Sequence, residues 1–197
     1  NPPIFKKAIA IRSILKLETG IEIDKKSINL LLGANTHIVI YPMNNKNEFN
    51  MVCIIRCNEY EPDKIKSLIE KKVLNQNPNL KKLFEGKIKS WPLYSTPKII
   101  PSYNKKVFYI GDAFNGFMPT LAQGAGQSIE SAYEIFNLLK QDKLDAPGIY
   151  FEKRAKRARI VRKRSNLNFF AFHFSNPLMQ EIRNTILKFL IKKNFFI

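Results

Sequence analysis

The sequence predicts an α+β fold: a mixed part of strands and short helices over residues 1–100, then one strand followed mainly by helices over residues 101–197. Three observations support this. Two β-rich runs flank a polar stretch, apolar residues recur at helical spacing after residue 127, and a dense basic run has helical composition. With 45% hydrophobic and 12% aromatic residues in 197, the chain can bury a core and is globular rather than disordered.

Residues 1–100 are expected to alternate between strands and short helices. The expected strands cover residues 36–41, 51–57 and 87–94. The expected helices cover residues 62–74 and 80–84. The first two strands, joined by a polar stretch, predict an antiparallel pair with a long turn. Pro62 suits a first helical turn, Gly86 ends the second helix, and Trp91 is the largest side chain of the last strand.

Residues 107–132, VFYIGDAFNGFMPTLAQGAGQSIESA, are the most informative segment. Residues 107–110 predict a buried strand, which would place Asp112 at the carboxyl end, where open α/β sheets collect ligands. A carboxylate there can accept hydrogen bonds from sugar hydroxyls. Gly124 and Gly126 let backbone N–H groups approach a ligand, and a helix over residues 127–140 adds a positive dipole end. A nucleotide cofactor suits this arrangement, although Asp112 in a turn or helix cap and glycines in a tight turn are the plain alternatives.

The pattern GDAxxxxxPxxAQGAGQSIExA in this segment resembles the second FAD fingerprint of the flavoprotein aromatic hydroxylases, the family of salicylate, para-hydroxybenzoate and ubiquinone-biosynthesis hydroxylases. Four further stretches look like family segments in family order: HIVIYPM at 37–43, WPLYS at 91–95, YFEKRAKRARIVRKRS at 150–165 and FHFSNPLMQEIRN at 172–184. The resemblance implies part of a FAD/NAD(P)-binding α/β domain plus a substrate-binding mixed β-sheet region, with carboxyl-terminal helices. On this basis we expect a substrate-binding region over 1–100, a FAD-binding strand-loop-helix segment over 101–145 and basic helices over 146–197.

The resemblance also implies cofactor-binding residues, with FAD as cofactor and NADH or NADPH as co-substrate. They are Gly111, Asp112, Pro119, Gly124, Ala125 and Gly126. Asp112 would hold a hydroxyl of the FAD sugar chain, Pro119 would shape the loop over the ring, and the glycines would touch the flavin through their backbone. Tyr41 and Trp91 could line a substrate pocket or be plain core residues. No catalytic side chain is assigned, since the flavin carries the chemistry.

The sequence departs from the family pattern at several positions. Many relatives have histidine where Asn115 stands and an acidic residue where Ser131 stands, and they show an Asp-Arg pair where this chain has Ser95 and Thr96. Asn115 cannot titrate, so a role that needs a protonated ring would be lost. These departures put the activity in doubt.

No GxGxxG pattern, which holds the ADP half of FAD in relatives, occurs in the 197 residues, and the chain opens on Asn1. We therefore expect a carboxyl-terminal portion of a longer enzyme that lacks roughly 150 residues or more. The alternative is a naturally short protein whose cofactor role has lapsed.

Much of the net charge of +17 is concentrated in one predicted helix, although lysine is plentiful throughout the chain. Its cationic residues are Lys153, Arg154, Lys156, Arg157, Arg159, Arg162, Lys163 and Arg164. A solvated helix face, an anion-binding surface and attraction to an anionic membrane all fit. Nucleic acid is not expected as a partner, because the phenylalanines at 169–174 follow the basic run in a block instead of alternating with it. Residues 176–196 predict an amphipathic basic helix that docks on its own protein or, alternatively, contacts a membrane peripherally.

The remaining features predict a soluble, cytoplasmic protein without a metal centre. No apolar stretch is long enough to span a membrane and no signal peptide opens the chain. His37 and His173 lack metal-ligand partners at sensible spacing, and Cys53 and Cys57 are expected to be reduced core thiols. The sequence indicates no oligomeric state.

Together these features predict an FAD-dependent monooxygenase that uses NAD(P)H and O2 on an aromatic or related small organic substrate, present as an incomplete chain that is inactive alone. A flavin oxidoreductase with another reaction is the first alternative. The second is a non-catalytic basic module that binds anionic membrane or nucleic acid. An upstream GxGxxG would separate the monooxygenase from the basic module.

Overall fold

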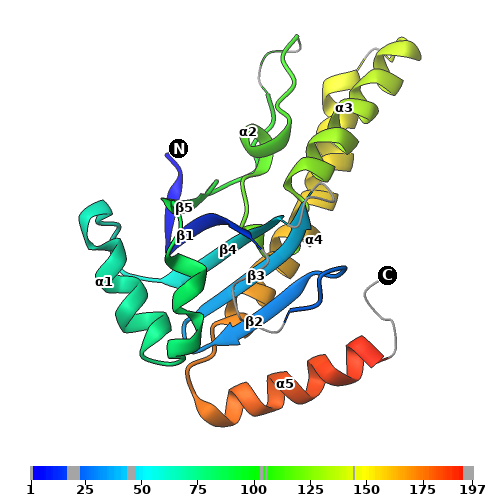
Figure 1. Ribbon diagram of the computed structural model, residues 1–197. Coiled ribbons are helices and arrows are strands. Elements are labelled where there is room, and N and C mark those ends of the chain that lie inside the picture. The colour runs from blue at the N-terminus through cyan, green and yellow to red at the C-terminus, as the bar shows by residue number, and fades with distance from the viewer. Residues whose placement is uncertain are drawn as a thin grey trace. The chain divides into compact units, whose positions relative to one another are not determined.

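A computed structural model describes residues 2–16, 23–43, 48–102, 104, 106–143 and 145–192 (Figure 1). Its elements are β1 (Ile4–Lys16), β2 (Asn29–Gly33), β3 (Thr36–Met43), β4 (Glu48–Arg56), η1 (Pro62–Lys64), α1 (Ile65–Ile69), η2 (Glu70–Leu74), η3 (Pro78–Phe84), β5 (Lys89–Ser95), α2 (Gly111–Asn115), η4 (Pro119–Leu121), α3 (Gly124–Lys140), α4 (Ala146–Phe172) and α5 (Pro177–Lys192). The predicted α+β class is confirmed.

The chain folds into two compact units. The helical unit comprises Asn1–Lys6 and Leu93–Phe169, and the sheet unit comprises Lys7–Pro92 and Phe170–Ile197. β1, β5 and α4 each begin in one unit and end in the other. The division of the sequence at residues 100 and 145 stays a prediction.

The sheet unit is built on a five-stranded sheet with the strand order β2-β3-β4-β1-β5. β3 and β4 pair antiparallel, as their composition predicts. Because side chains alternate between faces, the row of Ile11, Cys53 and Ile38 lies on one face and is buried. Residues of the helical turns over residues 65–84 pack on this face, on the side where Figure 1 shows α1. This row therefore belongs to the hydrophobic core of the sheet unit.

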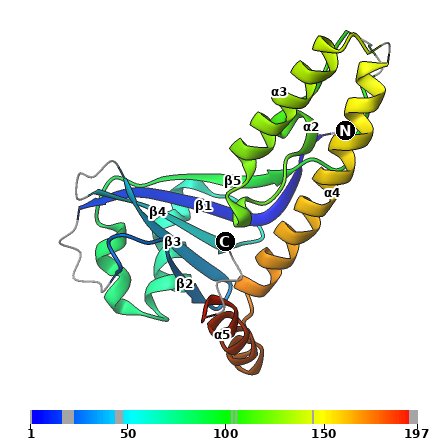
Figure 2. The same cartoon turned by 90° about the vertical axis from the view of Figure 1, so that its right-hand side faces the viewer.

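The helical unit is built on α3 and α4, which run side by side in opposite directions (Figures 1 and 2). The small residues Ala155 and Ala158 of α4 are buried with Leu138 of α3, and Phe114 of α2 joins the same cluster. The basic run of residues 153–164 lies within the single helix α4, as predicted.

The predicted strand over residues 107–110 is wrong. These residues form an irregular segment, and Val107, Tyr109 and Ile110 are 38–42% exposed. An apolar run becomes a strand only where a neighbouring strand supplies hydrogen-bond partners, and no described strand of this chain pairs with it. Its bonds come from elsewhere: the Val107 N–H donates to the Asn104 carbonyl, and the Tyr150 hydroxyl donates to the Tyr109 carbonyl.

The helix predicted to start at Gln127 starts at Gly124. The Gln127 N–H donates to the Gln123 carbonyl at 2.9 Å, so the first helical turn contains Gly124 and Gly126. A prediction that reserves glycine for loops misses this, because glycine is tolerated in a first turn whose N–H groups have no partner within the helix.

The predicted tail helix is confirmed over the described part of residues 176–196; residues 193–196 lie outside it. Arg183 of α5 is buried and donates to the carbonyls of Ala171 and Phe172, which ties the helix to its own unit. The helix also carries exposed apolar residues, including Ile186 and Phe189. No helix of the described chain is long and apolar enough to cross a membrane.

The two histidines form a buried pair in the sheet unit. Nδ1 of His37 lies 3.2 Å from Nε2 of His173, and the side chains are at most 2% exposed. Burial, together with the neighbouring His173, lowers the pKa of His37 to about 3. His37 is therefore neutral at pH 7, with a core role.

This burial predicts an acid-dependent loss of stability. The unfolded state takes up a proton on His37 near pH 6.5 and the folded state only near pH 3. The contribution of neutral His37 to the free energy of unfolding is fully present above about pH 6.5. It falls as the pH drops below that value, by about 1.5 kcal/mol from pH 6.5 to 5. Urea unfolding at several pH values in this range should show that the free energy of unfolding falls less steeply with decreasing pH in His37→Gln than in the unchanged chain. Equal slopes would contradict the assignment.

Candidate functional site

The short helix α2 places Asp112 at the surface of the helical unit. Gly111 has a φ of +56°, and a Cβ there would lie 2.7 Å from the Ser128 hydroxyl oxygen. Only glycine combines this backbone with such a close approach. The start of α2 is thereby held against the second turn of α3, and Asp112, the next residue, is exposed.

The connection from α2 to α3 is a sharp turn that starts at Pro119. Pro119 occupies the first position of η4, where its fixed φ suits a helical turn. Ala122 then adopts the left-handed conformation, with a φ of 52°. This reverses the chain and directs it into α3 through Gln123.

The amino terminus of α3 offers backbone donors without internal partners. The N–H groups of Gly124, Ala125 and Gly126 precede the first helical hydrogen bond, and no side chain caps the helix. A Cβ built on Gly124 or Gly126 would meet nothing within 4 Å. These glycines are therefore not required by packing against the described chain, and their donors lie at the positive end of a 17-residue helix.

Two side chains of α4 hold the segment between α2 and α3. Arg162 donates through Nε to Oδ1 of Asn115 at 2.8 Å and through Nη2 to the Thr96 hydroxyl at 2.8 Å. The Ser165 hydroxyl donates to the Met118 carbonyl, and the Thr120 hydroxyl donates to the Ser165 carbonyl at 2.7 Å. The two ends of the turn around Pro119 are thus fixed to one face of α4.

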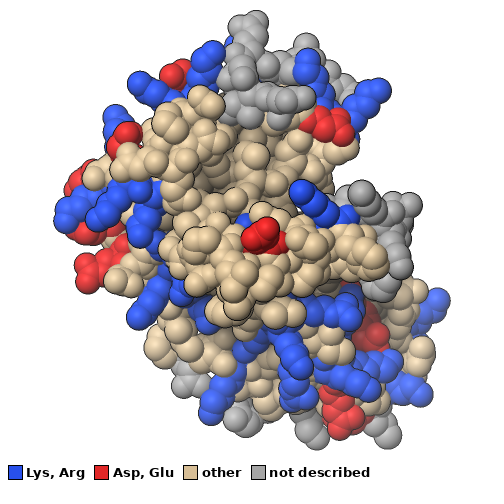
Figure 3. All heavy atoms as spheres, turned by 90° about the horizontal axis from the view of Figure 1, so that it is seen from below, with Lys and Arg blue, Asp and Glu red and all other residues tan. Residues whose placement is uncertain are grey.

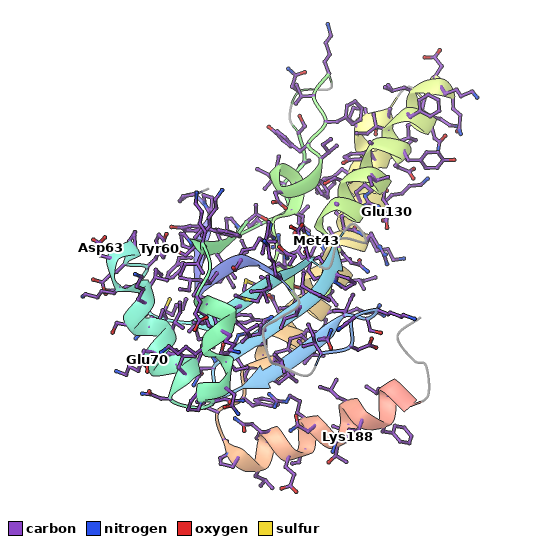
Figure 4. The ribbon with its side chains drawn as sticks, viewed as in Figure 1. Met43, Tyr60, Asp63, Glu70, Glu130 and Lys188 are labelled. Carbon is purple, nitrogen blue, oxygen red and sulfur yellow. The ribbon has the colours of Figure 1, made fainter. Side chains whose placement is uncertain are left out.

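A third side chain of α4 fixes α3. Arg154 donates to the Glu130 carboxylate at 2.8 Å and to the backbone carbonyl and side-chain oxygen of Gln127. Glu130 projects from α3 (Figure 4). Its hydrogen bond with Arg154 lowers the pKa of the Glu130 carboxyl. The first turns of α3 are therefore set in register against α4.

The basic run is thus only partly a solvated face. Lys153 pairs with Glu134, Arg154 and Arg157 pair with Glu130, and Arg162 bonds to neutral oxygens. On the face in Figure 3, Lys and Arg lie among Asp, Glu and uncharged residues. In the described chain, three cations of the run therefore pair with carboxylates, and Arg162 bonds to neutral oxygens instead.

Tyr41 and Trp91 lie in the sheet unit, on the face opposite its buried core. Tyr41 is paired with Asn50 across β3 and β4, in a row that continues to Ile14 of β1. Arg12, two residues from Ile14, lies on the same face, and its guanidinium sits 5.3 Å from the centre of the Trp91 ring. Both aromatic side chains are half-buried. They therefore belong to a mixed cationic and aromatic surface rather than to the core.

The sequence analysis assigned no site role to Arg154, Arg162 or Ser165. Their partners lie 24–66 residues away along the chain, so no local spacing signals them. The one available signal was a serine that closes an otherwise basic run. Among the described residues, no cluster of three His, Cys, Asp or Glu side chains could hold a metal ion.

The α+β fold of this chain is also found in solved structures of an FAD-binding protein and of a hydroxylase. Two solved structures share this fold: Klebsiella pneumoniae HpxO complexed with FAD and uric acid has a TM-score of 0.76 at 14% identity, over 93% of this chain and 50% of that one. A salicylate hydroxylase substrate complex has a TM-score of 0.76 at 19% identity, over 98% of this chain and 53% of that one.

The chain is also similar in sequence to curated proteins. The chain is 25% identical over 199 residues to the FAD-dependent monooxygenase OpS4 of Beauveria bassiana, over 89% of this chain and 46% of that protein. It is 27% identical to the 3-amino-4-hydroxybenzoate 2-monooxygenase PtnB3 of Streptomyces platensis, over 78% of this chain and 41% of that protein. No family model matches. The predicted resemblance to FAD-dependent monooxygenases is confirmed, and the chain spans about half the length of these relatives or less.

The contacts of Arg154 predict that its substitution lowers the free energy of unfolding more than substitution of the neighbouring Lys153 does. Arg154→Met should lower the free energy of unfolding by about 2 kcal/mol, because it breaks a mostly buried set of hydrogen bonds while half-exposed Glu130 regains water. Lys153→Met removes an exposed pair with Glu134 and should cost at most about 0.5 kcal/mol. Urea unfolding of both variants tests this. Equal losses would show that Arg154 has no special structural role.

Proposed function

We propose that the complete protein is an FAD-dependent monooxygenase that uses NADH or NADPH and O2 to hydroxylate an aromatic or related small organic substrate, and that this 197-residue part is inactive alone. The observation that carries the proposal is the uncapped start of α3, where Gly124 and Gly126 face open space. With exposed Asp112 and the turn at Pro119, it offers the contacts that a flavin needs.

The residues of the helical unit would bind and orient the cofactor. The Asp112 carboxylate would accept a hydrogen bond from a hydroxyl of the FAD sugar chain. The N–H groups of Gly124, Ala125 and Gly126 would donate to the pyrimidine end of the ring system, where the helix dipole favours negative charge. When bound, the flavin supplies the activation of O2, and Pro119 shapes the loop that helps to exclude water.

The sheet unit would bind the organic substrate. Trp91 and Tyr41 offer aromatic surface on one sheet face, and Arg12 adds a cation on the same face. Aromatic faces stack favourably on planar ligands. The relatives named above include a hydroxybenzoate monooxygenase and a salicylate hydroxylase, which is in keeping with a planar substrate for this chain.

An uncovered apolar surface supports the view that a further domain completes the cofactor site. One side of α3 exposes large side chains at helical spacing: Ile129 at 70%, Tyr133 at 65%, Phe136 at 60% and Leu139 at 59%. The segment over residues 107–110 is also exposed and has the composition of a strand. Both features suit packing against an open β-sheet, such as one that carries the absent GxGxxG turn.

The first test is the visible spectrum of the complete gene product after purification. We expect the purified protein to show a flavin absorption. Asp112→Ala should abolish this absorption or weaken FAD binding at least tenfold. Gly126→Val should weaken FAD binding as strongly while the melting temperature stays unchanged, because its side chain enters space that the described chain leaves open. Leu167→Val, at a 64% exposed position of α4 outside the exposed α3 surface, is the control for placing a valine on an exposed helix face.

A colourless protein that ignores added FAD would overturn the proposal and leave a basic binding module. Flavin binding without substrate-dependent NAD(P)H oxidation across a panel of aromatic acids would instead favour a flavin oxidoreductase with another reaction. Normal FAD affinity in Gly126→Val would show that the start of α3 is not part of the FAD site.

The exposed α3 surface gives a separate prediction. In the complete protein, Ile129→Glu should destabilise the fold by about 2 kcal/mol, because it places a charge in a buried interface. In the 197-residue chain the same change should shift stability by at most about 0.5 kcal/mol, since Ile129 is 70% exposed there. Thermal unfolding of both lengths measures the difference. A similar small effect in both would mean that nothing covers this surface.

A further inference from the structure

Among the described residues, Arg162 is the member of the basic run that is partly shielded from water and has no carboxylate partner. The other cations of the run without such a partner are exposed: Lys156, Arg159, Lys163 and Arg164. Its guanidinium donates to the side-chain oxygens of Asn115 and Thr96 and, at 3.4 Å, to the Pro97 carbonyl. All three acceptors are neutral. In the described part of the chain, Arg162 forms no ion pair, whereas Arg154 and Arg157 share Glu130.

The surroundings of Arg162 leave its positive field largely uncompensated. The side chain is half-buried, so water screens its charge incompletely, and the same burial lowers the pKa of its guanidinium. Neutral oxygens orient a cation but do not cancel its charge. The field therefore extends into the surrounding segment more strongly than that of an exposed cation.

The location of this charge ties it to the candidate flavin segment. Asn115 lies in α2, three residues after Asp112. Ser165, about one turn along α4 from Arg162, holds the Met118 carbonyl and Thr120 on either side of Pro119. Arg162 and Ser165 therefore form hydrogen bonds to the stretch that runs from Asp112 to the start of α3.

The side chains that Arg162 contacts leave its charge uncompensated. Thr96 and Asn115 occupy positions at which this chain differs from the residues expected by resemblance. An acidic side chain at or next to position 96 could neutralise Arg162, but Ser95 and Thr96 cannot. The Asn115 amide likewise leaves the positive charge intact.

We propose that Arg162 is a positioning residue of the cofactor segment whose unpaired positive charge makes the site bind the anionic reduced flavin more tightly, relative to oxidised flavin, than a neutral residue would. The proposal rests on the proposed function. Reduction with dithionite adds two electrons and one proton to neutral oxidised flavin and yields the anionic reduced form. A nearby cation favours that product.

The experiment uses the complete gene product and compares FAD dissociation constants for the oxidised and dithionite-reduced cofactor, with the midpoint potential as a second readout. Arg162→Gln should reduce the preference for reduced flavin about tenfold, which corresponds to a potential about 30 mV lower for this two-electron couple. Arg162→Lys keeps the charge and should restore the ratio to within about twofold, even where it weakens both affinities. Arg159→Gln, on the exposed side of the same helix, should leave the ratio unchanged.

A second variant keeps the test valid where Arg162→Gln fails to fold. Asn115→Asp conserves the acceptor for Arg162 and supplies the missing negative charge, so it should lower the preference in the same direction. Equal weakening of both flavin forms by Arg162→Gln, or a ratio no different from that of Arg159→Gln, would overturn the inference and leave a structural role. Failure of the unchanged protein to bind FAD would instead overturn the proposed function.

Discussion

The helical unit depends on one constraint: a single face of α4 must hold a segment that has little structure of its own. Between α2 and α3 the chain passes through a short helical turn and a left-handed residue at Ala122. Ordering each such residue costs roughly 1–2 kcal/mol of conformational entropy. Arg154, Arg162 and Ser165 offset that cost with hydrogen bonds to Gln127, Asn115 and Met118. The backbone donors of α3 are therefore presented by a rigid helix rather than by a loop.

The same constraint explains why some parts of the fold were predictable and others were not. Strands such as β3 and β4 follow from local composition, because each is a β-rich apolar run beside a polar stretch. The fingerprint from Gly111 to Gly126 was likewise visible as residue types at fixed spacing. The anchors on α4 were not, since Arg162 meets Thr96 across 66 residues. Their charge suggested a solvated face, yet burial converts part of it into structural hydrogen bonds.

The misassigned strand at residues 107–110 has a different cause. Its apolar composition correctly signals a segment suited to burial, but strand formation is a property of a pair. Without a paired neighbour in the described chain, Tyr109 keeps one carbonyl bond from Tyr150 and stays partly exposed. The shifted start of α3 is similar in kind, because the glycines are compatible with both a loop and a first turn. Composition sets what a segment can bury, and the available partners decide what it becomes.

The distribution of exposed apolar surface gives the cofactor segment its physical context. Side chains of the size of Ile129, Tyr133, Phe136 and Leu139 each gain roughly 1.5–3 kcal/mol when fully buried. Because these side chains are 59–70% exposed, covering the rest of their surface would gain about 4–8 kcal/mol, comparable to the stability of a marginal domain. The same helix begins with donors that face open space. A partner that covers this stripe would dock on the helix that presents those donors, so the energy of burial and the placement of a ligand at Gly124–Gly126 would be linked through one rigid element, α3.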